Sequence, residues 1–148
     1  MPVVPGERMG QAETARVRRA FERSFDVLPA MFAFVQEFAS AAEPDPAALT
    51  AVELAVEELF TNLVKYDGGR GDIELELERT AGTLRVTLVG RDGRPFDVTA
   101  VPDARTDLPL DQRRPGGLGI HLVRRMVDRF EYRFENGTSR TMIEKSLR

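Results

Sequence analysis

Three polar side chains, those of Glu58, Asn62 and Lys65, recur at spacings of four and three in a segment with the apolar periodicity of a helix. Residues so spaced are neighbours on a helix surface, so a carboxylate, an amide and an ammonium group should line up on one side. An amide oxygen suits Mg²⁺, a carboxylate can accept a proton from a hydroxyl or a water, and an ammonium group can meet a phosphate. The alternative is an ordinary exposed side with a Glu/Lys pair.

Three glycines, Gly116, Gly117 and Gly119, open a second helical segment in the sequence RRPGGLGIHLVRR. Bare backbone lets phosphate oxygens approach N–H groups, and a helix N-terminus favours negative charge. No G-K-[ST] follows, so this is not a P-loop. The glycines alone are equally consistent with a flexible joint before a helix. The preceding stretch, 93–115, is irregular and proline-bearing, and a loop of about 20 residues is often functional, for instance as a lid.

The composition of the chain narrows the classes of function. The 148 residues predict a single domain, and a net charge of -3 gives no broad attraction to nucleic acid. The sequence has no cysteine and one histidine, which excludes disulfides, thiolate chemistry and clustered histidine metal sites. No apolar run approaches the roughly 18 residues of a membrane span, and the N-terminus MPVVPGER lacks an apolar signal core. We therefore expect a cytoplasmic protein that contacts neither membrane nor nucleic acid directly.

Hydrophobic periodicity indicates the elements that must position these residues. Helices are predicted over 28–42, 47–66 and 118–130, and alternating strands over 73–78, 84–88, 131–135 and 140–147, with hairpin turns at Ala81-Gly82 and Asn136-Gly137. Residues 17–25 fit a helix or a strand, and we favour a strand. The order predicts an α+β fold, a two-layer α/β sandwich with a mixed, mostly antiparallel sheet and helices on one face. Residues 1–16 are expected to be flexible, and 17–148 to form the single domain.

The motifs ELFTN (58–62), DGRPFD (92–97) and GGLGIHLV (116–123) occur in this order. Together they resemble the histidine-kinase-like ATPase domains of the GHKL superfamily, which have the Bergerat-type ATP-binding fold. The similarity is greatest to the anti-sigma-factor serine/threonine protein kinases of bacteria. The resemblance implies Glu58 as general base and Asn62 as Mg²⁺ ligand. It implies a lid over about 98–115, and nucleotide contacts from Asn62, Lys65, Asp92, Gly93, Gly116, Gly117, Leu118 and Gly119.

What the resemblance implies about function is an anti-sigma regulatory factor that binds ATP and Mg²⁺. Such a protein would restrain a sigma factor, phosphorylate a serine on an antagonist protein and form a homodimer. Two alternatives remain at this point. One is a binding module that keeps the fold and sequesters a partner without phosphate transfer. The other is an ATP-hydrolysing module of a larger signalling complex.

The adenine end of the motif departs from the family pattern. The family places an aspartate two residues before the first glycine of D-x-G-x-G, where it accepts a hydrogen bond from the adenine amino group. Here that position holds Arg91, which can only donate, and Pro95 replaces the second glycine. Strand parity offers another acceptor, because a regular strand with Leu84, Val86 and Leu88 inward would also turn Gly90 and Asp92 inward. Asp92 is therefore the predicted adenine ligand, and a simple polar turn without nucleotide is the alternative.

Overall fold

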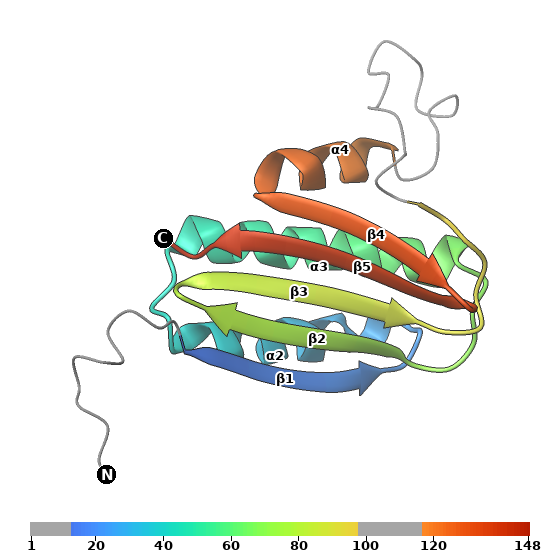
Figure 1. Cartoon of the computed structure of the whole chain (residues 1–148), viewed down its shortest axis with the longest axis horizontal. Coiled ribbons are helices and arrows are strands. Elements are labelled where there is room, and N and C mark those ends of the chain that lie inside the picture. The colour runs from blue at the N-terminus through green and yellow to red at the C-terminus, as the bar shows by residue number, and fades with distance from the viewer. Residues whose placement is uncertain (1–12, 98–116) are drawn as a thin grey trace.

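Five strands form one sheet in a computed structural model that describes residues 13–97 and 117–148. The strand order is β1-β2-β3-β5-β4, and every described pairing is antiparallel (Figure 1). The strands are β1 (Thr14–Phe21), β2 (Ile73–Thr80), β3 (Thr83–Gly90), β4 (Arg129–Glu135) and β5 (Thr138–Ser146). Both hairpins turn on the predicted pairs, because Ala81, Gly82, Asn136 and Gly137 all have positive φ.

Helices cover one face of this sheet and leave the other open. They are the short 3₁₀ helix η1 (Phe25–Val27), α2 (Leu28–Ser40), α3 (Pro46–Tyr66) and α4 (Gly117–Met126). Figure 1 shows α2 and α3 behind the sheet, and α4 packs mainly against α3. The predicted α+β two-layer sandwich is confirmed, and among the described strands the sheet is antiparallel throughout rather than mixed.

Three predicted boundaries were wrong. Strand β1 begins at Thr14, three residues before the expected domain boundary at 17, because Thr14 pairs with Thr80 on β2. The same strand ends at Phe21 rather than 25. Helix α4 ends at Met126 rather than 130, because the alternation R-F-E-Y-R-F-E starts β4 at Arg129. Residues 1–12 of the predicted flexible segment 1–16, and the predicted lid over about 98–115, lie outside the described residues.

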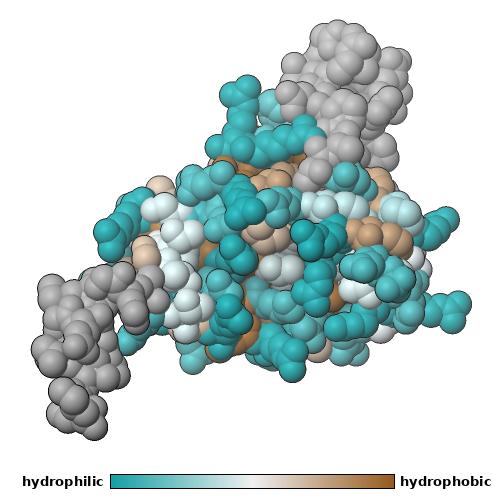
Figure 2. All heavy atoms as spheres, in the orientation of Figure 1, coloured by the Kyte–Doolittle hydropathy of each residue, from teal (hydrophilic) through white to brown (hydrophobic). Residues whose placement is uncertain are grey.

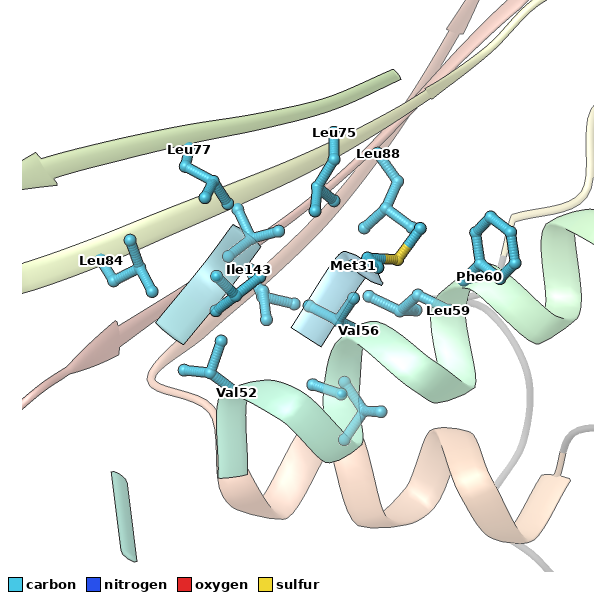
Figure 3. Close-up of a cluster of buried hydrophobic side chains, with 14 of the residues drawn as sticks. Met31, Val52, Val56, Leu59, Phe60, Leu75, Leu77, Leu84, Leu88 and Ile143 are labelled. Atoms are coloured by element: carbon cyan, nitrogen blue, oxygen red, sulfur yellow. The ribbon is translucent and has the colours of Figure 1, made fainter. Parts of the chain in front are cut away.

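The core lies between the apolar side of α3 and the inner face of the sheet. Figure 3 shows Val52, Val56, Leu59 and Phe60 of α3 facing inward side chains from three strands. Those strand residues, all at most 1% exposed, are Leu75, Leu77, Leu84, Leu88 and Ile143. Ile120 and Val123 of α4 join the same core. Burial of this side fixes the rotation of α3 about its axis, and with it the direction of the opposite, polar side.

The open face of the sheet carries a stripe of glutamates, which alternate with the buried residues of β2. Glu76 and Glu78 of β2 pair with Arg140 and Arg16 at 3.1 and 2.8 Å. The space-filling view shows this face as largely hydrophilic (Figure 2). It is lined by residues of all five strands and forms a broad hollow of about 1020 Å³. The glutamate stripe is therefore a solvated, ion-paired face, as the alternation predicts.

Helix α3, which carries the candidate residues, begins at a well-formed cap. The Asp45 side chain accepts a hydrogen bond from the Ala48 N–H at 3.3 Å, and Pro46 takes the first helical position. A capping carboxylate satisfies an amide that the helix leaves without a partner, and Pro suits that position because its missing N–H is not needed.

Replacing Asp45 by Ala should lower the free energy of unfolding by about 1 kcal/mol, because the Ala48 N–H loses its acceptor. Asp45→Asn keeps a capping oxygen and serves as the matched control. Urea denaturation of the two variants and the parent measures the difference. Equal stability of the Ala and Asn variants would show that this cap contributes nothing to α3.

Candidate functional site

Glu58 and Asn62 lie one turn apart on the polar side of α3 and are hydrogen-bonded. Asn62 is 2% exposed, and its Nδ2 donates to the Glu58 carbonyl at 2.8 Å and to Glu58 Oε1 at 3.2 Å. Both partners are acceptors, so the amide nitrogen must face them. No described residue donates to the Asn62 amide oxygen. That oxygen is available as a hard ligand atom for a metal ion.

The glycine segment meets this pair directly. A Cβ added at Gly119 of α4 would overlap the carboxylate of Glu58. The first turn of α4 therefore lies against the Glu58 side chain with no side chain of its own between them. The sequence placed these features 61 residues apart, and the fold brings them into contact. The carboxylate sits beside a helix N-terminus, where negative charge is favoured.

The other predicted ligands are spread along the same edge. Lys65 is exposed, one turn beyond Asn62. Gly117 and Leu118 belong to the first turn of α4, whereas Gly116 lies outside the described residues. As ligands, all of these stay predictions.

The adenine end departs from the regular strand that the parity argument assumed. Strand β3 ends at Gly90, and Asp92 is exposed with a φ of +57°. Arg91 is exposed too, and its carbonyl accepts from the Arg70 N–H at 3.3 Å. Gly90 does face the helix layer as predicted. The sequence predicted an inward Asp92 only if β3 continued past Gly90. The strand ends at Gly90, so the parity argument does not apply to Asp92.

A buried carboxylate that sequence reasoning missed lies beside Gly93. Asp67 caps the C-terminus of α3, its side chain is 3% exposed, and Oδ2 accepts from Arg23 Nη2 at 3.3 Å. Arg23 also donates to the carbonyls of Leu63 and Gly71, at 3.2 and 2.9 Å. In the sequence, Asp67 directly follows the predicted helix 47–66. The sequence offered one signal for it, which is the position of a carboxylate directly after a helix. A helix C-terminus disfavours negative charge, so an aspartate there is unusual.

Three aromatic side chains border this region: Phe96 on the loop after β3, Tyr66 at the end of α3 and Tyr132 on β4. The rings of Tyr66 and Phe96 have centroids 5.5 Å apart, and the Phe96 N–H donates to the Tyr132 hydroxyl at 3.0 Å. Burial raises the pKa of Tyr132 above its usual value, and the negative charges of Asp67 and Asp97 raise it further. Tyr132 is therefore a neutral phenol near pH 7 and does not serve as a base.

The described residues contain no group of three or more His, Asp or Glu side chains that could hold a metal ion. A divalent ion at Asn62 would need most of its ligands from water and from a bound phosphate, which is the coordination that Mg²⁺ prefers. None of the described helices is long and apolar enough to span a bilayer.

Residues 21–144 match the protein family described as the histidine kinase-like ATPase domain. The chain belongs to this family. The match contains Glu58, Asn62, the loop after β3 and the glycine-led helix α4, so the ATPase domain accounts for the whole candidate site. No match was found among curated proteins.

Solved structures show the same fold. The RsbU and RsbW domains of Rv1364c from Mycobacterium tuberculosis align with a TM-score of 0.63 at 13% identity, over 90% of this chain and 32% of that one. The histidine kinase domain of a blue-light activated histidine kinase from Erythrobacter litoralis EL346 aligns at 0.50 and 16% identity, over 82% of this chain and 60% of that one. This ATPase domain thus spans less than two thirds of either neighbour.

The contact between Glu58 and Gly119 should appear as energetic coupling. Gly119→Ala forces the carboxylate out of its bond with Asn62, a cost of order 1 kcal/mol that offsets the better helix propensity of Ala. In a Glu58→Ala background the same substitution should be neutral or stabilising by up to about 1 kcal/mol. A double-mutant cycle by chemical denaturation measures the difference, and equal effects in both backgrounds would contradict the contact.

Proposed function

We propose that this ATPase domain binds Mg²⁺-ATP along α3 and acts as an anti-sigma regulatory factor with serine/threonine protein kinase activity. The observation that carries the proposal is the Glu58–Asn62 pair lying against the bare backbone of Gly119. A proton acceptor, a metal-holding amide oxygen and a helix N-terminus for phosphate meet at one place. The resemblance of the three motifs to anti-sigma-factor kinases supports the kinase activity.

Each residue then has a separate task in phosphate transfer. Glu58 accepts the proton of the incoming serine hydroxyl, whose oxygen forms the new bond to the γ-phosphorus while the bond to the ADP oxygen breaks. Asn62 holds Mg²⁺, which when bound neutralises charge on the phosphate oxygens. The backbone N–H groups of Gly116, Gly117, Leu118 and Gly119 receive the phosphates, and Lys65 adds a positive charge.

The proposed partners are a sigma factor, which the protein restrains, and an antagonist protein that carries the target serine. A homodimer is part of the proposal, and its support is the resemblance to the anti-sigma-factor kinases. A second candidate function is a binding module that sequesters a partner without phosphate transfer. Arg91 and Pro95 favour it, since neither can take over the hydrogen-bonding role that the family's aspartate has at the adenine.

Mg²⁺-ATP should stabilise the protein measurably. At 100 times Kd, a bound ligand adds about 2.7 kcal/mol to the free energy of unfolding, which for a domain of this size corresponds to a rise of about 5–10 °C in Tm. A thermal melt at millimolar Mg²⁺-ATP, with Mg²⁺ alone as control, measures it. An unchanged Tm would exclude the kinase and leave the binding module.

Glu58→Ala should reduce formation of ADP from Mg²⁺-ATP by about 10²–10⁴-fold, the usual contribution of a general base, while ATP binding stays nearly intact. Glu57→Ala, which removes an exposed carboxylate from the neighbouring position of α3, is the matched control. Loss of both binding and folding in the Glu58 variant would instead assign this residue a structural role.

A further inference from the structure

The inward position at the end of β3 holds no side chain. Gly90 continues the inward series of Leu84, Val86 and Leu88. A Cβ added there would point to Ser139 Oγ at 3.1 Å, Arg23 Nη2 at 3.3 Å and Asp67 Oδ2 at 3.5 Å. A strand that continued regularly past Gly90 would turn Asp92 toward the helix layer, but β3 ends at Gly90 and its inward series ends on bare backbone.

The carboxylate of Asp67 fills that space from the opposite layer. It follows the end of α3 and lies beside three glycines, one in the turn directly after it and two in and after β3. A Cβ at Gly69 would meet Oδ2 at 2.5 Å, a Cβ at Gly93 would meet Oδ1 at 2.7 Å, and the Gly90 position adjoins Oδ2. The loops around Asp67 thus approach it closely only because they lack side chains.

One oxygen of this carboxylate has no hydrogen-bond donor among the residues that the structure describes. Oδ2 is bound by Arg23, whereas no described residue donates a hydrogen bond to Oδ1. The only fully buried side-chain polar atom without a partner, among the described residues, is Arg85 Nε. Oδ1 therefore keeps an accessible edge on a side chain that is otherwise 97% buried. Such an acceptor is suited to a donor from a ligand, because a buried acceptor left without a donor is costly.

We propose that Asp67 Oδ1 accepts the hydrogen bond of the adenine amino group and replaces the aspartate that this chain lacks at the end of β3. The inference rests on the proposed nucleotide site. Asp67 follows Asn62 by five positions, a rise of about 7.5 Å along the axis of α3. A nucleotide along this part of α3 has a metal-holding amide at its phosphate end and a fixed acceptor at its base. The Arg23 pair orients the carboxylate and leaves Oδ1 for the ligand.

Asp92 is the competing acceptor and is less suited to the role. It is exposed and its backbone is in the left-handed region at φ +57°, so a hydrogen bond donated to its carboxylate by a ligand competes with water. Asp67 is desolvated and held by a guanidinium group, which makes a directional acceptor with one open position.

Inosine triphosphate tests the assignment, because it differs from ATP only in the base edge, where a carbonyl acceptor replaces the amino donor. Kd values for both nucleotides, with Mg²⁺, are measured by calorimetry on the full chain. The parent should prefer ATP by about ten- to hundredfold. In Asp67→Asn, the amide oxygen stays on Arg23, a donor-only group, so the NH₂ faces the base and inosine triphosphate should become the preferred nucleotide. Asp92→Asn, the matched control, should keep the ratio of the parent.

Each outcome decides one claim. Equal Kd values for the two nucleotides in the parent would overturn the role of Asp67 while leaving the nucleotide site in place, and this holds even if Asp67→Asn does not fold. A proportional loss of both nucleotides in Asp67→Asn would make Asp67 purely structural. A changed ratio in Asp92→Asn alone would assign the base to Asp92. Binding of neither nucleotide by the folded parent would instead reject the proposed function.

Discussion

The contact between the Glu58 carboxylate and the bare backbone of Gly119 is the constraint on which the candidate site depends. It joins the middle of α3 to the first turn of α4, and a side chain at 119 would separate them. The core fixes the two helices in this arrangement, because Val56 and Leu59 of α3 and Ile120 of α4 are all buried in the same hydrophobic cluster. The same packing that buries the apolar side therefore directs the polar side toward the start of α4.

Helix dipoles explain how charge is distributed around this contact. Glu58 lies at the N-terminal end of α4, where a carboxylate is stabilised, whereas Asp67 lies at the C-terminal end of α3, where it is disfavoured. Arg23 offsets the second placement by pairing with Asp67 and donating to the Leu63 carbonyl in the last turn of α3. An unfavourable carboxylate held by a dedicated partner is a common feature of functional sites, where local stability is exchanged for chemistry.

The periodicity of the sequence was sufficient to predict the helices and strands, and to predict the part of the candidate site that lies on α3. The alternation around Ile73 and Leu84 predicted β2 and β3, and the spacing of Glu58 and Asn62 predicted their shared side of α3. The contact of the glycine segment with this pair could not be predicted from the sequence, because only the packing of α4 on α3 brings Gly119 to Glu58. Asp67 could not be identified from local pattern, since its role depends on Arg23 and Gly93, which are distant in sequence. The parity argument failed at Asp92 because β3 ends at Gly90, and parity holds only within a strand.

The most direct test of this account is a crystal structure with Mg²⁺ and a non-hydrolysable ATP analogue. The account predicts that the phosphates lie over the N-terminus of α4, the metal on the Asn62 amide oxygen, and the adenine amino group on Asp67 Oδ1. A nucleotide bound in the hollow on the open face of the sheet, or bound with its phosphates away from Gly119, would contradict it.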